Sequence, residues 1–441
     1  MPAVAHVLVI VQNLPVPLDR RVWLECQALR SAGYDVSVIC PKGPGDPRLE
    51  VIDGVRIHKY RPAPAAAGAL GYLLEFVYSW LRTTWLSRRV WRRQPFDVLQ
   101  ACNPPDTYWA LARYWKRRGV RFVYDQHDLN PELFLSRFGE PTGLAGRAQL
   151  TGLRWLERMT YRTADHVIST NTSYRDVAFT RGGLGHDEVT VVRSGPDTEA
   201  MRPLLPPSDV LPARRHSLVY LGIMGPQDGV DLVLDVVDEL VRVRGRRDVC
   251  ATLLGFGDCY EDLVRRSHEL GLDDVVTFTG RAGPEMIAEH LSAATLGVCP
   301  DLKTPLNDVS TMNKTMEYMA YALPSVAFDL VETRVSGQDT CLYVPSGDVV
   351  AFADAVELIL DDPERREAMS LRARERVREE LDWRPQRAAY LSVFDRLTGR
   401  DRRAPVASAA PAYVPDTPEE LGRFVRARGP RPTARRQPLG A

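Results

Sequence analysis

Short β-rich runs alternate with helix-length stretches through most of the 441 residues, and this alternation constrains the fold more than any other feature. Near the start, Val7–Val11 is typical of a buried strand. Apolar residues at helical spacing predict a helix over Arg20–Ala32, which Gly33 ends, and Val36–Cys40 predicts the next strand. Strands joined by helix-length crossovers form parallel sheets with helices on both faces.

The same alternation continues through both halves of the chain. The first half predicts further strands at Val55–Tyr60, Val98–Ala101, Arg121–Tyr124, Val167–Ser169 and Val189–Val192, with helices over 106–118, 146–164 and 173–181. The second half predicts strands at Leu218–Leu221, Ala251–Leu254, Val275–Thr279, Leu296–Cys299, Ser325–Phe328 and Leu342–Val344, with helices at Val230–Val243, Asp258–Leu270, Pro284–Ala293 and Lys314–Ala322. Two α/β units of similar size predict two facing Rossmann-like domains, with ligands in the cleft beyond the strands' carboxyl ends.

Proline and charge content mark the expected boundaries. Residues 203–215 carry prolines without periodicity and are predicted to link a first domain of residues 1–202 to a second of residues 216–382. Residues 401–441 are rich in proline and arginine, and we expect a disordered tail because so little apolar surface can be buried. This tail is either a solvated leftover or a weak tether to an anionic surface.

Composition excludes several classes of protein. Lys+Arg and Asp+Glu are 57 each, and this balance argues against a surface built to grip nucleic acid. The seven cysteines are far apart without a C-x-x-C pair, which fits buried thiols in a reducing cytoplasm better than a zinc ribbon or a disulfide framework. We expect no secretory signal and no spanning helix, because no uncharged apolar run approaches about 18 residues.

Two segments at the ends of predicted strands carry polar or glycine residues. The sequence DQHDLNPE over 125–132 places His127 between acids where sheet ligands bind, although loop histidines are common without a function. The glycines of GIMGPQDG over 222–229 let the backbone approach a ligand closely, or form a simple tight turn.

Two further segments follow in the second half. In GFGD over 255–258 the glycines permit another tight turn, and Asp258 is a natural helix cap. The sequence NKTMEYMAYALP begins a helix that Asn313 or Thr311 can cap. Lys314 and Glu317 lie three residues apart on one side of this apolar helix. A charged pair there is costly unless it faces a cleft, the alternative being a surface ion pair.

Taken jointly, these segments make residues 4–398 resemble the glycosyltransferases of family 4. The residues that carry the resemblance are Lys314, Glu317-Tyr318-Met319-Ala320, Pro324, Thr279-Gly280-Arg281, Gly255-Phe256-Gly257 and Ser194-Gly195-Pro196-Asp197. The last group is similar to the family's Asn-Gly-x-Asp turn, with Ser in place of Asn. The resemblance implies an α/β GT-B fold of two Rossmann-like domains with parallel sheets and a C-terminal crossover helix, residues 383–400 packing back on the first domain.

The resemblance also implies a function and roles for residues. A retaining enzyme would move a sugar from a nucleotide-sugar, bound mainly by the second domain, to an acceptor bound mainly by the first. The Lys three residues before the Glu resembles exopolysaccharide and O-antigen type members that use UDP-sugars. Candidate catalytic residues are His127, Lys314 and Glu317; candidate donor-binding residues are Met224, Gly225, Gly255, Gly257, Arg281, Lys303, Asn313 and Thr315; candidate acceptor or cleft residues are Arg20, Asp128 and Arg193.

Within these roles, Glu317 would accept hydrogen bonds from the ribose, and the start of its helix would bind the diphosphate. Arg281 and Gly257 would meet the base, and His127 would face the sugar or the acceptor. We expect no cofactor and no metal ion, because no Asp-x-Asp stands in a metal-ligand context and protein donors can stabilise the leaving group.

The sequence departs from the family pattern at the positions that meet the donor diphosphate. The family's usual Arg and Lys are replaced by Ile223 and Asp228, and we expect Asp228 to turn away as a helix cap. The first Glu of the usual E-x7-E pair is replaced by Val309, beside Asp308, and residues 13–21 replace a glycine-rich loop. Other groups must then meet the phosphate charge: Lys314, Lys303, Arg193, Arg20 or backbone N–H groups from Gly225 onward.

Residues 70–93 predict an amphipathic helix. Its apolar face is Leu70, Leu73, Leu74, Val77, Leu81 and Trp85, and arginines gather at its end. Such a helix can lie in a membrane interface, where lipid-linked acceptors and an anionic inner membrane face would be its partners, or it can be a core helix with a solvated basic end.

Two other functions remain open from the sequence. One is an isomerase similar to nucleotide-sugar 2-epimerases, which would need no acceptor groove. The other is a catalytically silent GT-B partner of a polysaccharide assembly, suggested by Ile223 and Val309.

Overall fold

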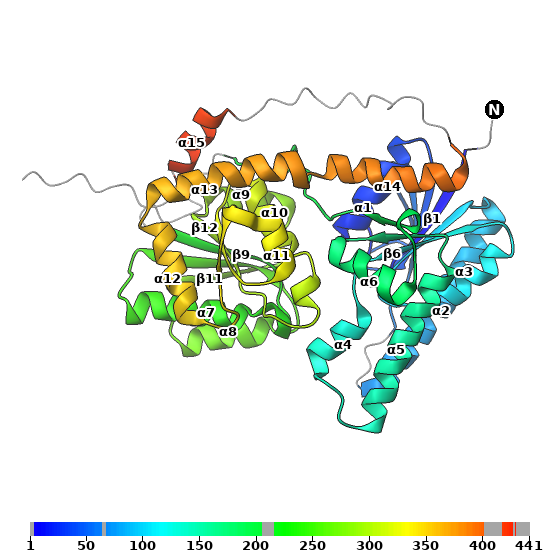
Figure 1. Ribbon diagram of the computed structural model, residues 1–441, viewed down its shortest axis with the longest axis horizontal. Helices are drawn as coiled ribbons and strands as arrows, with labels where there is room; N and C mark the ends of the chain where they lie inside the picture. Colours follow the sequence, from blue (N-terminus) through cyan, green and yellow to red (C-terminus); the bar gives the residue numbers. More distant parts are fainter. Residues whose placement is uncertain (1–3, 64–67, 205–215, 401–416, 427, 429–441) are drawn as a thin grey trace, which may run out of the picture. The chain divides into compact units, whose positions relative to one another are not determined.

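A computed structural model describes residues 4–63, 68–204, 216–400, 417–426 and 428 (Figure 1). The chain divides into two compact units. The N-terminal unit takes Met1–Ser194 and Arg384–Ala412, and the C-terminal unit takes Gly195–Trp383 and Tyr413–Ala441. Each contains one sheet, so the predicted α/β class is confirmed.

The N-terminal unit is built on an eight-stranded sheet of order β3-β4-β2-β1-β5-β6-β7-β8. Its neighbours pair in parallel, except that β3 pairs antiparallel with β4. The strands are β1 (His6–Ile10), β2 (Asp35–Pro41), β3 (Leu49–Ile52), β4 (Val55–Tyr60), β5 (Val98–Cys102), β6 (Arg121–Gln126), β7 (His166–Ser169) and β8 (Val189–Val191). The edge strand β3 was not predicted, although the Asp53-Gly54 turn that follows it, with φ of 49° and 77°, is a hairpin signal.

Helices lie on both faces of this sheet (Figure 1). They are α1 (Arg20–Ser31), α2 (Gly68–Arg93), α3 (Trp109–Lys116), α4 (Asn130–Phe138), α5 (Leu144–Thr163), α6 (Thr172–Gly182) and α14 (Trp383–Thr398). From Arg384 onward α14 belongs to this unit: Tyr390 donates to Gln100 Oε1 at 2.6 Å, and Tyr34 donates to Asp395 at 2.6 Å. The predicted C-terminal crossover helix is therefore present.

The C-terminal unit has a six-stranded, wholly parallel sheet of order β11-β10-β9-β12-β13-β14. The strands are β9 (His216–Ile223), β10 (Val249–Phe256), β11 (Val276–Gly280), β12 (Leu296–Cys299), β13 (Ser325–Phe328) and β14 (Cys341–Val344). The helices are α7 (Val230–Asp238), α8 (Tyr260–Glu269), α9 (Pro284–Ala293), α10 (Asn313–Ala320), α11 (Val331–Gly337), α12 (Val349–Leu360), α13 (Pro363–Arg376) and α15 (Pro418–Arg426). β10 is buried over all but its last residue, as expected of a central parallel strand.

The structure corrects the expectation of a wholly disordered tail. Helix α15 packs Leu421 and Val425 against Ala322 of the C-terminal unit. Arg428 is buried and donates to the carbonyl oxygens of Ala322 at 2.7 Å and Tyr321 at 2.6 Å. Arg426 also pairs with Glu367 of α13, so both apolar and charged contacts dock this helix. The rest of the predicted tail lies outside the described residues.

The boundary between the units also differs from the predicted one at residue 202. The structure assigns 195–202 to the C-terminal unit because this segment is tied to the end of α13 and the turn beyond it. Thr198 Oγ1 donates to Asp382 Oδ2 at 2.5 Å, and Arg374 donates to the Thr198 carbonyl at 3.0 Å. Most of the predicted linker lies outside the described residues.

The cysteines are all free, and all are buried except Cys259, which is half-buried. No helix in the described part of the chain is both long and apolar enough to cross a membrane.

Candidate active site

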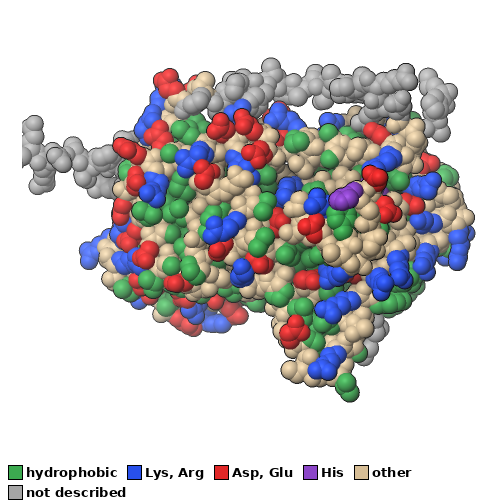
Figure 2. Space-filling view, viewed as in Figure 1, with side chains coloured by type: hydrophobic (Ala, Val, Ile, Leu, Met, Phe, Trp, Pro, Cys, Tyr) green, Lys and Arg blue, Asp and Glu red, His purple; other side chains and the backbone are tan. Residues whose placement is uncertain are grey.

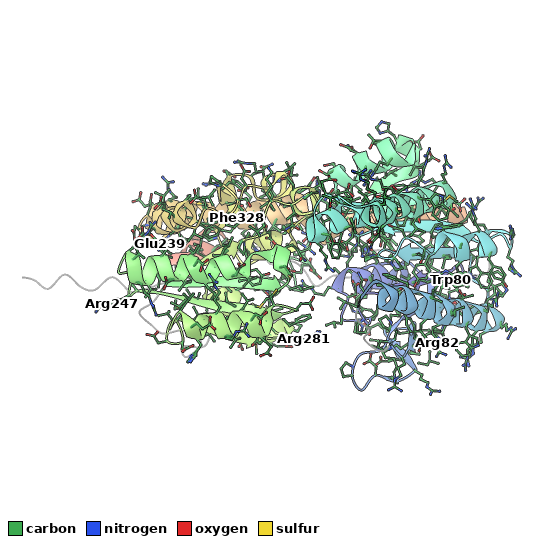
Figure 3. The ribbon with its side chains drawn as sticks, turned by 90° about the horizontal axis from the view of Figure 1, so that it is seen from below. Trp80, Arg82, Glu239, Arg247, Arg281 and Phe328 are labelled. Carbon is green, nitrogen blue, oxygen red and sulfur yellow. The ribbon has the colours of Figure 1, made fainter. Side chains whose placement is uncertain are left out.

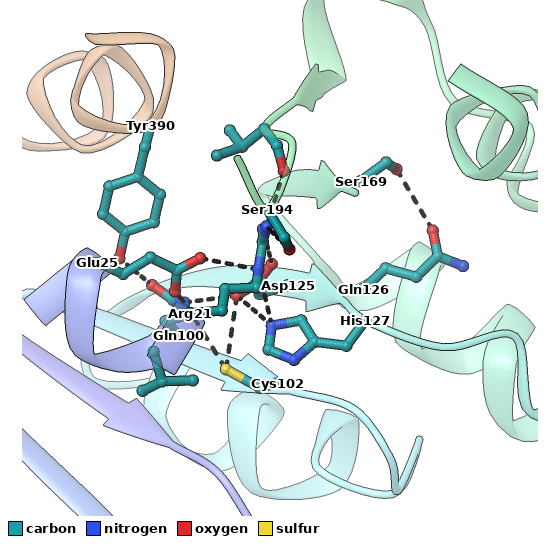
Figure 4. A network of polar contacts seen from close by, with 12 residues as sticks. Arg21, Glu25, Gln100, Cys102, Asp125, Gln126, His127, Ser169, Ser194 and Tyr390 are labelled. Atoms are coloured by element: carbon teal, nitrogen blue, oxygen red, sulfur yellow. Dashed lines mark hydrogen bonds and ion pairs between the residues drawn. The ribbon is translucent and has the colours of Figure 1, made fainter. Parts of the chain in front are cut away.

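A buried polar cluster lies at the carboxyl ends of β5 and β6 in the N-terminal unit (Figure 4). Gln100 and Cys102 come from β5, Asp125 from β6, and Arg21 and Glu25 from α1. Asp125 and Glu25 are fully buried. Buried charges are tolerated when they are paired and hydrogen-bonded, so the buried carboxylates of this cluster must have hydrogen-bonding partners.

Arg21 makes most of the contacts to these buried carboxylates and to the neighbouring backbone (Figure 4). Its Nη2 lies 3.1 Å from Asp125 Oδ1, and its Nε lies 3.1 Å from Glu25 Oε1. Its Nη1 donates to the Val192 carbonyl at 2.8 Å and to Ser194 Oγ at 3.0 Å. One guanidinium thus ties α1 to the ends of β6 and β8.

Gln100 completes the shell around the two carboxylates. Its Nε2 donates to Glu25 Oε2 at 2.8 Å and to Asp125 Oδ2 at 2.9 Å. Its Oε1 accepts from Tyr390 of α14 at 2.6 Å, which fixes the orientation of the amide. The crossover helix therefore contributes directly to the order of this cluster.

His127 is the residue through which the cluster reaches solvent, with 17% of its side chain exposed. Its Nε2 lies 2.8 Å from Asp125 Oδ2, and its backbone N–H donates to Asn103 Oδ1 at 2.7 Å. Arg21 Nε donates to the same Nε2 at 3.2 Å, so Nε2 is held between the guanidinium and the Asp125 carboxylate.

The pKa values follow from burial and charge. Burial opposes ionisation of Asp125, but the charges of His127 and Arg21 outweigh it and hold the pKa of Asp125 well below its usual range. Burial also opposes the imidazolium, yet the Asp125 carboxylate raises the pKa of His127. Burial and the charge of Asp125 together raise the pKa of Glu25. In this cluster the Asp125 carboxylate therefore stays ionised, and it increases the basicity of the neighbouring His127 imidazole.

The predicted acceptor residues have different surroundings. Arg20 is exposed at the start of α1, and its neighbour Arg21 is the one that turns inward. Asp128 is half-buried, and burial raises its pKa. Arg193 is half-buried, and its backbone N–H donates to Gln386 Oε1 at 2.9 Å. The structure brings Asp128 next to His127 but does not gather all three residues into one site.

Cys102, Asp125 and His127 offer ligand atoms within 4.8 Å of one another, the spacing of a metal site. The chemistry of the donors fits a cation poorly. The Arg21 guanidinium already occupies the same carboxylate, and burial raises the pKa of the Cys102 thiol well above its usual value. A divalent ion would have to displace a charge-assisted pair and deprotonate that thiol.

In the C-terminal unit, glycines allow two strand ends to pack closely. Gly222 at the end of β9 pairs with Gly255 of β10, and a Cβ on Gly255 would lie 1.9 Å from the Gly222 carbonyl oxygen. At Gly257, with φ of 152°, a Cβ would lie 2.6 Å from the Met224 carbonyl oxygen. The Met224 side chain is fully buried. Met224 is a predicted donor residue, but its N–H donates to the Phe256 carbonyl at 2.8 Å and its carbonyl accepts from the Cys259 N–H at 2.9 Å, so its backbone groups already have partners.

The turn after β9 corrects the expectation for Asp228. Its carboxylate does turn away, but it accepts from the Gly225 N–H at 2.8 Å within its own turn and does not cap α7. The capping position of α7 is Gly229, without a side-chain hydrogen bond. The Gly225 N–H, proposed as a phosphate donor, is consequently taken, while the side chain of Ile223 is 53% exposed.

Lys314 lies buried at the start of α10, against the end of β9. Its Nζ is 2.5 Å from Asp301 Oδ1, and it stands 5.3 Å from the centre of the Tyr220 ring. Burial opposes the ammonium, but the Asp301 carboxylate outweighs it and raises the pKa of Lys314. A Cβ on Gly222 would lie 3.2 Å from Lys314 Cε, so the glycine makes room for this side chain.

The start of α10 differs from the predicted cap. Met312 takes the N-cap position, and it makes no side-chain cap hydrogen bond. Asn313 is exposed and Glu317 is half-buried, so both could contact a ligand. Thr315 is fully buried, with its Oγ1 3.5 Å from Cys299 Sγ, so its hydroxyl points into the core.

The remaining predicted donor residues lie on the surface. Arg281 is exposed, and its guanidinium carbon stands 3.7 Å from the centre of the Phe256 ring (Figure 3). Lys303 is exposed and lies 3.4 Å from Asp308, which also accepts from the Val331 N–H at 3.0 Å. Asp308 precedes Val309, which replaces the first Glu of the family's pair. Its carboxylate is thus already paired with Lys303 and the Val331 N–H.

Sequence reasoning missed Arg21, Glu25, Gln100 and Asp301 as site residues. The signal for Arg21 and Glu25 was present, because they form a charged pair four residues apart in an otherwise apolar helix face. Lys314 and Glu317 form a similar charged pair, three residues apart. Asp301 carries no local pattern, since its partner is thirteen positions further along the chain.

Two family models match the chain: the glycosyl transferase 4-like domain over residues 18–195, and glycosyl transferases group 1 over residues 215–362. Alpha-D-kanosaminyltransferase of Streptomyces kanamyceticus is 31% identical over 261 residues, which are 57% of this chain and 64% of that protein. The match thus spans less than two thirds of that relative's length.

Solved structures show the same fold. Sucrose-phosphate synthase from Thermosynechococcus elongatus matches with a TM-score of 0.72 and 19% identity, over 90% of this chain and 100% of that one. Anabaena Alr3699/HepE in complex with UDP-glucose matches with a TM-score of 0.66 and 16% identity, over 89% and 99%. The two sheets and the crossover helix therefore form a GT-B fold.

Proposed function

Since this chain belongs to the GT-B glycosyltransferases of the family 4 type, we propose that it moves a sugar from a UDP-sugar to an acceptor in exopolysaccharide or glycolipid assembly, with retention at the anomeric carbon. In this transfer the bond between the anomeric carbon and the diphosphate oxygen breaks. The acceptor hydroxyl oxygen bonds to the anomeric carbon and loses its proton, and UDP leaves.

The observation that carries the donor proposal is Lys314 at the start of α10. An ammonium group, first-turn N–H groups without a side-chain cap from Met312, and a glycine turn lie together, and such a combination attracts phosphate. Lys has three donors, and Asp301 accepts one of them. We assign the remaining donors to the diphosphate, where they would stabilise the leaving UDP.

The rest of the donor would lie along the same edge of the sheet. Glu317, one turn into α10, would accept from the ribose hydroxyls, and Arg281 on the Phe256 ring would meet the base. A UDP-sugar donor is supported by the similar fold of Alr3699/HepE, solved with UDP-glucose.

In the N-terminal unit we assign His127 to the sugar or the acceptor. Asp125 lies 2.8 Å from its Nε2, and the carboxylate strengthens the basicity of the imidazole. Arg21 and Gln100 would act as positioning residues, because they hold Asp125 rather than a substrate.

Peripheral membrane binding is part of this proposal, and helix α2 supports it. The helix turns Thr83, Ser87 and Val90 inward while Leu81 and Trp85 stay 56% and 50% exposed. The end of α2 carries Arg88, Arg89, Arg92 and Arg93, and Figure 2 shows further Lys and Arg side chains on the visible face of the same unit. An outward apolar stripe beside arginines is the pattern of a helix that lies on anionic lipid. The side chains of Leu70, Leu73 and Leu74 lie outside the described residues.

A panel of UDP-glucose, UDP-N-acetylglucosamine, GDP-mannose and ADP-glucose tests the donor. We expect one UDP-sugar to raise the melting temperature and to be hydrolysed slowly to UDP without acceptor. Glu317→Gln should lose most of the affinity at unchanged stability, whereas the matched control Glu380→Gln, on an exposed glutamate, should not. No stabilisation by any donor refutes the proposal. Recovery of an epimerised donor would indicate an isomerase, and binding without turnover a silent partner.

A further inference from the structure

A basic pocket lies at one end of the N-terminal sheet, and its lining includes none of the residues around His127. Its volume is about 690 Å³. Lys42 and Arg61 directly follow β2 and β4, Arg48 and Lys59 flank them, and Arg82 comes from α2. The volume is that of a small-ligand site, and the carboxyl ends of parallel strands are where such sheets bind ligands.

Hydrogen bonds hold the rim of this pocket in place. Lys59 Nζ, with 2% of its side chain exposed, lies 2.9 Å from Asp46 Oδ2 and 2.8 Å from Glu50 Oε2. Asp46 Oδ2 also accepts from the Gly43 N–H at 2.9 Å. The loop between β2 and β3 is thereby tied to β4.

The charge of this pocket is not balanced. Lys59 takes both nearby carboxylates, and no ion pair in the described part of the chain meets Lys42, Arg48, Arg61 or Arg82. Arg82 lies on α2 (Figure 3), and its buried Nε has no hydrogen-bond partner among the described residues. Five cations against two carboxylates leave three positive charges around one cavity. Fixed like charges repel, so a multiply charged anion that enters is strongly favoured.

We propose that this pocket binds a phosphate or diphosphate group carried by the acceptor. Guanidinium groups bind phosphate oxygens through paired donors, and three arginines surround the cavity. The exposed Leu81 and Trp85 adjoin Arg82 on α2, and a lipid attached to that phosphate would have apolar surface beside it. The proposal rests on the proposed glycosyl transfer, because it names the chemical class of the acceptor.

Calorimetry with inorganic pyrophosphate tests the pocket on the full chain. UDP is kept saturating, so that the diphosphate site at Lys314 is filled. We expect one pyrophosphate to bind, and the Arg48→Gln/Arg61→Gln variant to bind about tenfold more weakly. The control Arg117→Gln/Arg147→Gln removes the same charge at exposed positions elsewhere on this unit and should leave the affinity unchanged. Absent binding, or equal affinities in both variants, overturns the proposal.

Two further titrations distinguish the sources of the phosphate. In the first, the protein is sedimented with phosphatidylcholine vesicles that contain undecaprenyl diphosphate. Co-sedimentation of the wild type that is lost in the Arg48→Gln/Arg61→Gln variant would identify a lipid-linked acceptor. In the second, glucose 1-phosphate is titrated into both proteins. If the wild type binds it, the variant does not, and neither protein binds the vesicles, the acceptor is a soluble phosphorylated molecule. UDP affinity in the same samples tests the donor separately. A chain that binds pyrophosphate but no UDP keeps the pocket and loses the proposed function.

Discussion

At the scale of single residues, each unit buries a cation against a carboxylate near the ends of its strands. In the N-terminal unit Arg21 meets Asp125, and in the C-terminal unit Lys314 meets Asp301. Such pairs give little net stability, because the cost of desolvating both charges offsets their attraction, but removal of one partner is costly. Each cation is therefore kept in a fixed place and in its charged state.

The pair of Lys314 and Asp301 gives a prediction that separates stability from binding. Lys314→Met strands a buried carboxylate, and we expect it to lower the free energy of unfolding by about 3 kcal/mol. Lys314→Met combined with Asp301→Asn should recover most of that loss, yet both variants should lose donor affinity. Urea unfolding and donor calorimetry provide the two readouts. A double variant that binds the donor normally would remove Lys314 from the donor site.

The residues around Asp125 predict that catalysis needs no divalent ion. Arg21 holds the carboxylate, and the Cys102 thiol stays protonated because burial raises its pKa. We expect full activity after treatment with EDTA, measured as UDP release. Activity that is abolished by EDTA and restored by manganese or magnesium would contradict this, and Asp125→Asn would then test whether the ion binds here.

At the scale of elements, α2 buries Leu86 and Val90 together with hydroxylated side chains, and it leaves two large apolar side chains exposed. Small and hydroxylated side chains, among them Thr83 and Ser87, approach the sheet closely, and Trp115 Nε1 donates to Ser87 Oγ at 3.3 Å. The outer face keeps Leu81 and Trp85, with Arg82 and Arg89 placed 5.4 and 5.5 Å from the Trp85 ring centre. An unpartnered apolar stripe of this kind marks an interaction surface.

This arrangement predicts the behaviour of two sets of variants with vesicles. Leu81→Ser with Trp85→Ser should weaken co-sedimentation with anionic vesicles while leaving the melting temperature nearly unchanged, because both side chains are already half exposed. Replacing Arg88, Arg89, Arg92 and Arg93 by Gln should weaken it too, by about 1 kcal/mol for each charge near the surface. Binding should fall with salt. If neither set of variants changes co-sedimentation, α2 is an ordinary packed helix and not a membrane-binding one.

At the scale of the whole molecule, both units bury neutral histidines. Burial lowers the pKa of His58 and His166 in the N-terminal unit, and of His216 in the C-terminal unit, to about 4. In the unfolded chain these groups take up protons near pH 6.5. Because the unfolded state then binds more protons, their contribution is complete above pH 6.5 and is lost as the pH falls toward 4.

His58 allows this pH dependence to be measured at one site. We expect the wild type to lose about 1 kcal/mol more than His58→Leu between pH 7 and pH 4, after allowance for solvent screening. Urea midpoints of the two proteins across this range provide the comparison. Parallel curves for the two proteins would show that His58 is protonated equally in both states, and the acid sensitivity would then arise elsewhere.

The sequence by itself determined the order of elements, the α/β class and the family. Buried strands such as Ser325–Phe328 were predicted to the residue, because a short apolar run between turns has one stable place in a parallel sheet. The short, half-exposed strand Leu49–Ile52 was missed. Its own residues give a weak pattern, and it forms a strand because it pairs with β4. The segments around Ser194, Gly255, Arg281 and Lys314 were enough, taken jointly, to indicate the fold.

The tertiary structure alone decided which charged groups meet. Periodicity shows that a residue is buried but not what lies opposite it, and Arg21 meets Asp125 and the Val192 carbonyl, which are both more than a hundred positions away. The same holds for Asp228, which turned to Gly225, for Arg428, which docked part of a tail expected to be disordered, and for the cations that line one pocket. Hydrogen bonding is satisfied in space rather than along the chain, so these contacts exist only once both sheets are packed.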